Sequence, residues 1–214
     1  MLWVFATPER TVYRVVEHRD RATFHQTIGP HYGGVLVSDC LSVYDDATTV
    51  QHKCYAHHRK AIAAAQRARA TPSEWLGRVE VLLKNAIALG QERAPLDDAP
   101  WHQRLRALRL AARAVLEETP RACAQEEAVR ARLWKQRDHL FVFLEQAGVD
   151  ATNNLGRTPA PKAFGVIRRK LSCGNKSRRG ARTFEVLASL AATCRQRGED
   201  FLQIASAAAR LQPV

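Results

Sequence analysis

A short apolar run that ends in an acid constrains the fold of this chain more than any other feature. Residues 34–38 read Gly-Val-Leu-Val-Ser, are rich in β-branched side chains, and follow a second glycine, a pattern that predicts a short buried strand. Asp39 follows at the carboxyl end of that strand, which is the edge of an open α/β sheet where ligands bind. A carboxylate there can bind Mg²⁺ through hard oxygen atoms. The alternative interpretation is that Asp39 caps the next helix.

The remaining patterns predict an α/β start, a helical middle and a basic, helical end. We therefore divide the chain into residues 1–70, 71–148 and 149–214. In the first part, apolar alternation, turn residues and good helix formers predict strands at 3–6, 12–16, 35–37 and 51–55 and helices at 21–28, 42–47 and 56–70.

The middle part carries the clearest helix signals. Thr71, Pro72 and Glu74 match a capping box with Thr71 as the cap. Apolar stripes at helical spacing then predict helices that end at Gly90, that cover 105–115, and that run from 125 to 146. We interpret these stripes as core. The arginines beside them are either solvated or in contact with DNA, and the pattern leaves both open.

The last third of the chain carries most of the excess positive charge. Residues 151–214 hold twelve basic side chains against three acidic ones, a net charge of +9 out of +12 for the whole chain. A basic cluster in this part can neutralise backbone phosphates, which predicts a DNA partner without base-specific readout; its members are Arg168, Arg169, Lys170, Lys176, Arg178 and Arg179. The alternative is a solvated basic surface. Two amphipathic helices are predicted beyond it, at 183–197 with a stop at Gly198 and at 201–211.

The cysteines and the hydropathy of the chain limit the cellular compartments in which we expect it. The five cysteines form no repeated pair, and the apolar start lacks the basic segment of an export signal, so we expect reduced thiols in a cytoplasm. Cys54 and His57 could form half of a zinc site with His52 and His58 nearby, or have an incidental role. No run of eighteen apolar residues is present, so no membrane partner is expected.

Several segments, taken together and in order, resemble transposases of the insertion-sequence-66 family. They are Leu2–Pro8, Leu36–Asp39, Tyr44–Asp45, Cys54–His57 with Arg59, Asp150–Leu155, Arg169–Ser172, Gly174, Ser177 and Thr193–Gly198. The resemblance implies an α/β, ribonuclease-H-like core with an all-helical insertion and a basic helical C-terminal element. It also implies an Asp-Asp-Glu site that holds Mg²⁺, in which Asp39 matches the second Asp. A bacterial, cytoplasmic and nucleoid-associated location follows from the same resemblance.

The sequence departs from the family pattern at two catalytic positions. The first Asp of the family lies upstream of the strand at which this chain begins, so we expect an N-terminal truncation. The Glu of the family follows the Asn pair, whereas Gly156–Phe164 contains no acid, and Pro159 and Pro161 would break the helix that carries the Glu. Two compensating frameshifts would explain this stretch. Because DNA strand transfer needs two metal ions held by several carboxylates, we expect the chain to be inactive.

The family pattern also predicts that Asp39 and the pair Asn153 and Asn154 converge in space. These asparagines either contact phosphate or form a turn and a helix cap. Two functions stay open: an inactive remnant of a Mg²⁺-dependent strand-transfer enzyme, and a non-catalytic DNA-binding protein that forms homo-oligomers or associates with a full-length transposase. A nuclease that recruits Asp45, Asp46 or Glu145 is a third, weaker alternative, because no spacing brings these acids together.

Overall fold

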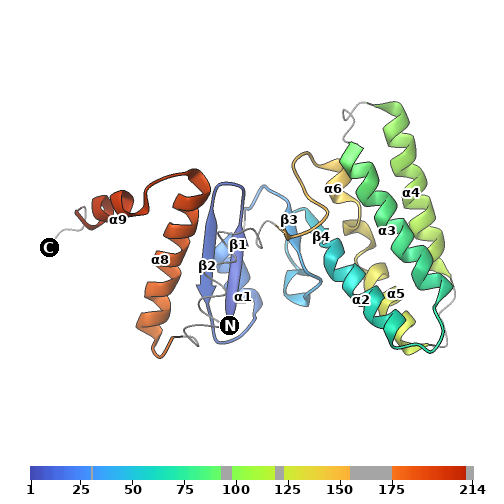
Figure 1. Ribbon diagram of the computed structural model, residues 1–214, viewed down its shortest axis with the longest axis horizontal. Helices are drawn as coiled ribbons and strands as arrows, with labels where there is room; N and C mark the ends of the chain where they lie inside the picture. Colours follow the sequence, from blue (N-terminus) through green and yellow to red (C-terminus); the bar gives the residue numbers. More distant parts are fainter. Residues whose placement is uncertain (30, 93–97, 119–122, 155–174, 211–214) are drawn as a thin grey trace. The chain divides into compact units, whose positions relative to one another are not determined.

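The computed structural model describes residues 1–29, 31–92, 98–118, 123–154 and 175–210 in two compact units. The first unit combines residues 1–23 with the chain from 154 onwards, and the second contains residues 24–153 (Figure 1). Helix α1 (Arg21–Ile28) is the connection between residues 1–23 and the second unit. The domain limits at residues 70 and 148 stay a prediction, as does the ribonuclease-H-like core.

The first unit begins with an antiparallel hairpin, as the alternation of apolar residues predicts. Strand β1 (Leu2–Ala6) pairs with β2 (Thr11–Val15), with Val4 opposite Tyr13. The hydroxyl of Thr7 accepts hydrogen bonds from the N–H groups of Glu9 and Arg10, which closes the turn. The alternate residues of the hairpin then face helix α8 (Arg178–Arg197), where Tyr13 packs against Ala188 and Ala192.

Helix α8 also covers the outer edge of β2 through a ladder of polar side chains. The N–H of Thr11 donates to Thr193 Oγ1 at 3.1 Å, that of Tyr13 donates to Ser189 Oγ at 2.9 Å, and that of Val15 donates to a carboxylate oxygen of Glu185. Four helical residues rise about 6 Å and two strand residues about 6.7 Å, so the two repeats match closely enough for three successive bonds. The ladder therefore fixes the register of α8 on the hairpin.

The end of α8 is set by its last residues and by Gly198. Gly198 adopts a left-handed conformation with φ 69°, which ends the helix where the sequence predicts the stop. Helix α9 (Phe201–Arg210) follows, as predicted. The start of α8 lies five residues before the predicted one, because Ser177 accepts a hydrogen bond from Gly180 N–H and caps the helix.

The second unit opens with a short parallel pair of strands. Strand β3 (Leu36–Ser38) pairs with β4 (Gln51–Lys53), with Ser38 opposite Lys53. A single 3-10 turn, η1 (Ser42–Tyr44), lies between them where a helix over 42–47 was predicted. Both strands end at the same edge because they are parallel. Asp39 follows β3 and Cys54 follows β4 at that edge.

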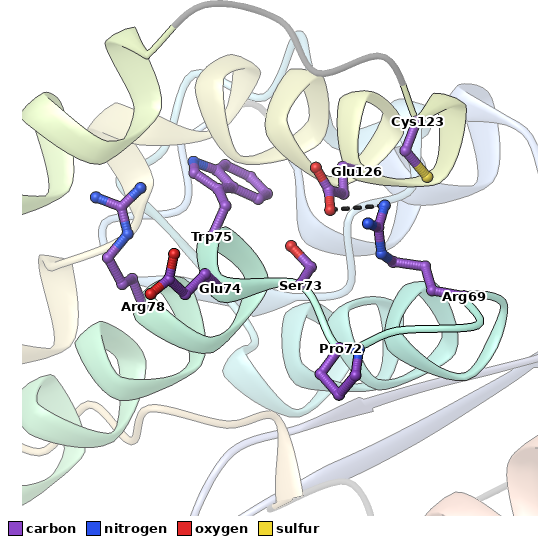
Figure 2. Close-up of a pocket in the computed structure, with 8 residues that line it drawn as sticks. All are labelled: Arg69, Pro72, Ser73, Glu74, Trp75, Arg78, Cys123 and Glu126. Atoms are coloured by element: carbon purple, nitrogen blue, oxygen red, sulfur yellow. Dashed lines mark ion pairs between the residues drawn. The ribbon is translucent and has the colours of Figure 1, made fainter.

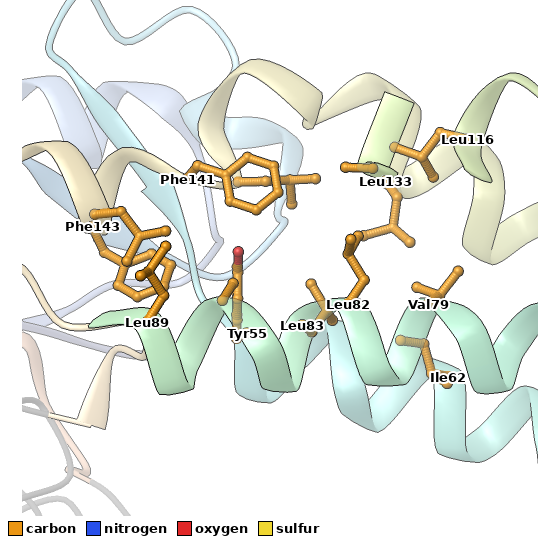
Figure 3. Packing of buried hydrophobic residues seen from close by; sticks show 14 of the residues in the cluster. Tyr55, Ile62, Val79, Leu82, Leu83, Leu89, Leu116, Leu133, Phe141 and Phe143 are labelled. Atoms are coloured by element: carbon orange, nitrogen blue, oxygen red, sulfur yellow. The ribbon is translucent and has the colours of Figure 1, made fainter. Parts of the chain in front are cut away.

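Helices form the rest of the second unit and enclose its core. They are α2 (Tyr55–Arg67), α3 (Glu74–Glu92), α4 (Ala99–Glu117), α5 (Ala124–Lys135), the 3-10 turn η2 (Arg137–His139) and α6 (Val142–Glu145). Figure 3 shows how Leu82 and Leu83 of α3 pack with Tyr55 and Ile62 of α2 and with Leu133 of α5. The apolar stripes predicted as core are therefore core.

Two predictions about this unit are wrong in detail. The cap of α3 is Ser73, whose hydroxyl accepts from Leu76 N–H, and not Thr71. The helix predicted over 125–146 breaks at Gln136 into α5, η2 and α6. The reason lies in the five consecutive residues 140–144, all of which are buried. A continuous helix with one covered face cannot bury five successive side chains, so the chain must turn to enclose them.

Candidate functional site

Asp39 lies directly after β3, half exposed, at the carboxyl edge of the parallel pair. Its Oδ1 atom accepts a hydrogen bond from Leu41 N–H at 3.2 Å, which forms a turn two residues long. The residue that caps η1 is Leu41, without a side-chain bond, so the alternative interpretation of Asp39 as a helix cap is wrong. The turn orients the carboxylate at the strand edge, and no backbone N–H of the described chain donates to its second oxygen.

A buried lysine lies beneath this edge. Lys53 is 1% exposed, and its ammonium donates to Ser38 Oγ at 3.2 Å and to Gln51 Oε1 at 2.8 Å. The ammonium also lies 5.3 Å from the centre of the Tyr44 ring, a cation–π contact. Burial lowers the pKa of Lys53, and the negative charges of Cys40, Asp45 and Asp39 act against that shift. A positive charge is thus held close to Asp39 by neutral partners.

Cys54 joins the Asp39 edge to the segment that contains Asn153. Its N–H donates to Ser38 O at 2.8 Å, and its thiol lies 3.2 Å from Asn153 Oδ1 and 3.3 Å from Asn153 N. The next residue, Tyr55, donates its N–H to Ala151 O at 2.9 Å. Asn153 therefore reaches, through Cys54, the edge of the strand pair at which Asp39 lies. The contact uses the Asn153 side chain for a thiol, and Asn154 is exposed.

The thiol of Cys54 has a polar environment although the residue is fully buried. Burial alone would raise its pKa, but hydrogen bonds from His57 and from the Asn153 N–H outweigh burial and lower it. The other two histidines of the predicted half zinc site have different partners. Both ring nitrogens of His52 face the backbone oxygens of His139 and Ala151, and His58 Nε2 lies 3.6 Å from the Cys40 thiol.

The described residues do not assemble the metal site that the resemblance implies. They contain no group of three or more Asp, Glu, His or Cys side chains placed to hold a metal ion. The acids considered for a recruited nuclease site have other partners: Asp45 binds Lys135 at 2.7 Å, Asp46 lies 3.6 Å from His25, and Glu145 binds Arg109. Asp39 alone supplies one carboxylate at the edge, so a two-ion site does not fit this part of the chain.

The basic cluster is only in part within the described residues. Arg168, Arg169 and Lys170 lie outside them, as does Gly156–Phe164. Arg178 and Arg179 form the exposed start of α8, and Lys176 lies exposed just before the cap Ser177. Arg178 contacts Glu17 at 3.1 Å with both side chains largely in solvent, and Lys176 and Arg179 have no ion pair within the described ranges. This exposed turn can meet an anionic partner without losing buried contacts.

The arginines of the helical middle differ from this cluster. Along α4, Arg104 pairs with Glu92, Arg109 with Glu145 and Arg113 with Glu117. Because each charge has an acidic neighbour, these arginines attract phosphate less than the start of α8 does. Of the two interpretations left open by the sequence, the solvated one fits them better.

A cavity of about 570 Å³ lies where the starts of α3 and α5 meet the end of α2. Figure 2 shows Trp75 and Ser73 in its wall and the ion pair between Arg69 and Glu126, 2.9 Å long, across it. This cavity is lined by none of the catalytic, metal-binding or DNA-binding residues that the sequence predicts. The residues of its wall cap helices and form ion pairs. The cavity is separate from the Asp39 edge.

Sequence reasoning overlooked three features of the site. The buried position of Lys53 and the contact of Cys54 with Asn153 both depend on tertiary packing. The third is the end of α5 and the turn after it, where an exposed tryptophan, Trp134, stands in the basic segment Arg132–Arg137. A single tryptophan among three basic residues in that segment was a signal that could have found it.

Comparison with known families gives a match over most of the chain. The model described as Transposase IS66 family matches residues 1–183. No curated protein and no solved structure matches the chain. Within the described residues, no helix combines the length and the apolar character needed to cross a membrane.

Proposed function

This chain belongs to the IS66 family of transposases, and from that premise we propose that it binds DNA as a transposase-derived protein that does not itself catalyse strand transfer. The observation that carries the proposal is the exposed, basic start of α8, held in register on the hairpin. The ladder from Glu185, Ser189 and Thr193 to β2 holds the helix. Its first turn therefore presents Arg178 and Arg179 from a rigid support, with Lys176 just before the cap.

The proposed lack of catalysis rests on the carboxylates. Strand transfer by this class of enzyme needs two divalent ions roughly 3.5–4 Å apart, which several acids must hold. Asp39 is the acid that matches the family pattern, at the end of the parallel pair, and the stretch Gly156–Phe164 has no acid where the family has its Glu. We propose for the same reason that Mg²⁺, the ion expected from the family, has no complete site here.

The position of Asp39 supports a ribonuclease-H-like core as the fold of this region. Asp39 ends β3, β4 lies parallel beside it, and the segment before Asn154 reaches the same edge through Cys54. Chemistry in open α/β sheets lies at the carboxyl ends of strands. We also propose that the protein is cytoplasmic and nucleoid-associated in a bacterium. Its further partner is a second copy of this chain or a full-length transposase.

DNA binding is tested by titrating a short duplex at several salt concentrations. We expect log K to fall linearly with log salt, and the slope to decrease by about 0.9 for each phosphate contact that is removed. Lys176→Ala and Arg179→Ala should each reduce the slope by about that amount. Arg195→Ala, at the opposite end of the same helix, is the matched control and should leave the slope nearly unchanged. Equal slopes for all variants would contradict a role for the start of α8.

The lack of catalysis needs a separate measurement. Purified protein is incubated with supercoiled plasmid and Mg²⁺ or Mn²⁺, and nicked or joined products are measured. We expect none above the level of an Asp39→Ala variant. Nicking by the wild type that Asp39→Ala abolishes would show an active site and would overturn this part of the proposal.

A further inference from the structure

The end of α5 and the turn η2 form an exposed basic surface with an aromatic centre in the second unit. We name it the Trp134 patch; it consists of Arg132, Trp134, Lys135 and Arg137. Trp134 is 37% exposed, whereas Trp3, Trp75 and Trp101 are all at or below 6%. A large apolar ring is thus kept in solvent on a helix whose other face, through Leu133, is core.

One cation lies against this ring. The guanidinium of Arg137 lies 4.9 Å from the ring centre, held there by a 2.9 Å hydrogen bond from Arg137 Nη1 to Trp134 O. The acidic contact of Arg137 is its sequence neighbour Asp138 at 3.8 Å, with both side chains about half exposed or more. Arg132 is exposed and has no ion pair within the described part of the chain. The patch therefore has an exposed ring with a guanidinium against it and a further exposed arginine on the same helix end.

The patch lies beside the Asp39 edge. Lys135 reaches across to Asp45, six residues after Asp39, with a 2.7 Å ion pair. Burial raises the pKa of the Cys40 thiol and lowers the pKa of His58; the nearby charge of Arg132 opposes the first shift and adds to the second, and these two side chains are in contact. Arg132 and Lys135 thus lie close to the loop that begins with Asp39.

We propose that the Trp134 patch binds single-stranded DNA, with an unpaired base stacked on Trp134 and a backbone phosphate on Arg137. Stacking on an aromatic ring inside a basic groove is the general way in which proteins hold single strands without reading sequence. A duplex keeps its bases stacked on each other, so it would use only the cations. The choice of nucleic acid over another polyanion rests on the proposed function; the site is separate from the start of α8.

The experiment uses the full chain and an oligodeoxythymidylate of about twenty nucleotides, which has no secondary structure. Binding is followed by fluorescence anisotropy of a dye on the oligonucleotide and, separately, by quenching of protein tryptophan fluorescence. Because the other three tryptophans are buried, quenching on binding should report Trp134. Circular dichroism of each variant shows that it is folded.

Trp134→Ala should weaken oligonucleotide binding about tenfold, and Trp134→Phe should keep most of the affinity while abolishing the quenching. Arg106→Ala is the matched control, an exposed helical arginine on α4 with no ion pair in the described residues, and should change affinity less than twofold. Unchanged affinity of Trp134→Ala, or quenching that persists in Trp134→Phe, would overturn the inference. Duplex binding by the same variants separates the two proposals. If duplex binding depends on the start of α8 and Trp134→Ala does not weaken oligonucleotide binding, only the inference fails. If the oligonucleotide needs Trp134 and no duplex binds, only the proposed function fails.

Discussion

Helix α3 carries two glycines in different surroundings, and alanine at each position tests how tightly the second unit is packed. A Cβ atom on Gly77 would have no heavy atom within 4 Å. A Cβ atom on Gly90 would lie 2.8 Å from Phe143 Cε2 and 3.1 Å from Leu144 Cδ2. The same substitution in the same helix therefore meets open space at one site and a packed ring at the other.

The expected magnitudes follow from two opposing effects. Alanine in place of glycine inside a helix is favourable by about 0.8–1.0 kcal/mol, so Gly77→Ala should stabilise the protein by roughly that amount. At Gly90 the added methyl group overpacks the core, which costs about 1–3 kcal/mol. Phe143 has little room to move, because its ring lies 5.0 Å from that of His52 and 5.2 Å from that of Tyr55. We expect Gly90→Ala to be less stable than the wild type by about 1 kcal/mol, the difference of these terms.

Urea unfolding followed by far-UV circular dichroism and by tryptophan fluorescence measures both variants. The two should differ by about 2 kcal/mol in free energy of unfolding, at an unchanged dependence on urea. If Gly90→Ala stabilises the protein as much as Gly77→Ala, Phe143 moves aside at little cost, and the argument from close packing is wrong.

Three further predictions concern buried histidines, the hydrogen bonds from α8 to the edge of β2, and the cap of α4. Burial lowers the pKa of His58 to about 3 and that of His52 to about 4, so each takes up a proton on unfolding below its ordinary pKa. Each should lower the free energy of unfolding by about 2 kcal/mol between pH 7 and pH 5, so the fall measured by urea unfolding should be about 2 kcal/mol smaller in His58→Gln than in the wild type. Ser189→Ala removes the acceptor of the Tyr13 N–H and should lower the free energy of unfolding of the first unit by about 1 kcal/mol, as measured by urea unfolding. Ser206→Ala, on the exposed helix α9, should have no effect in that measurement. Asp98→Ala removes the cap of α4 and should lower the melting temperature by about 2–4 °C, which calorimetry would show, with an unchanged temperature as the contrary result.

Most of the secondary structure could be predicted because its signals are local. The apolar alternation of the hairpin, the stop at Gly198 and the helix formers of α2 all act within a few residues, and each prediction is confirmed. The predicted helix over 125–146 is wrong because its break depends on what surrounds residues 140–144. Periodicity shows which residues are apolar, but it does not show that all sides of a segment are covered.

The candidate site depended more on the fold. The strand before Asp39 and the basic start of α8 follow from sequence pattern, and the family follows from the order of short segments along the chain. The partners of these residues do not. Cys54 and Asn153 are 99 residues apart and meet through a thiol, a contact type that no spacing rule anticipates.

The sequence by itself determined the type of each main element, the excess of positive charge and the membership of the IS66 family, because these are properties of single residues and short segments. Only the tertiary structure decided which charges are spare and which are paired. Arg104 and Arg109 of α4 pair with glutamates from other elements, whereas Arg179 and Arg132 have no ion pair within the described chain. Packing also decided that α8 lies along β2, because three polar side chains at helical spacing match three N–H groups at strand spacing. An electrostatic or hydrogen-bonded partnership depends on distance in space, and the fold is what converts sequence separation into that distance.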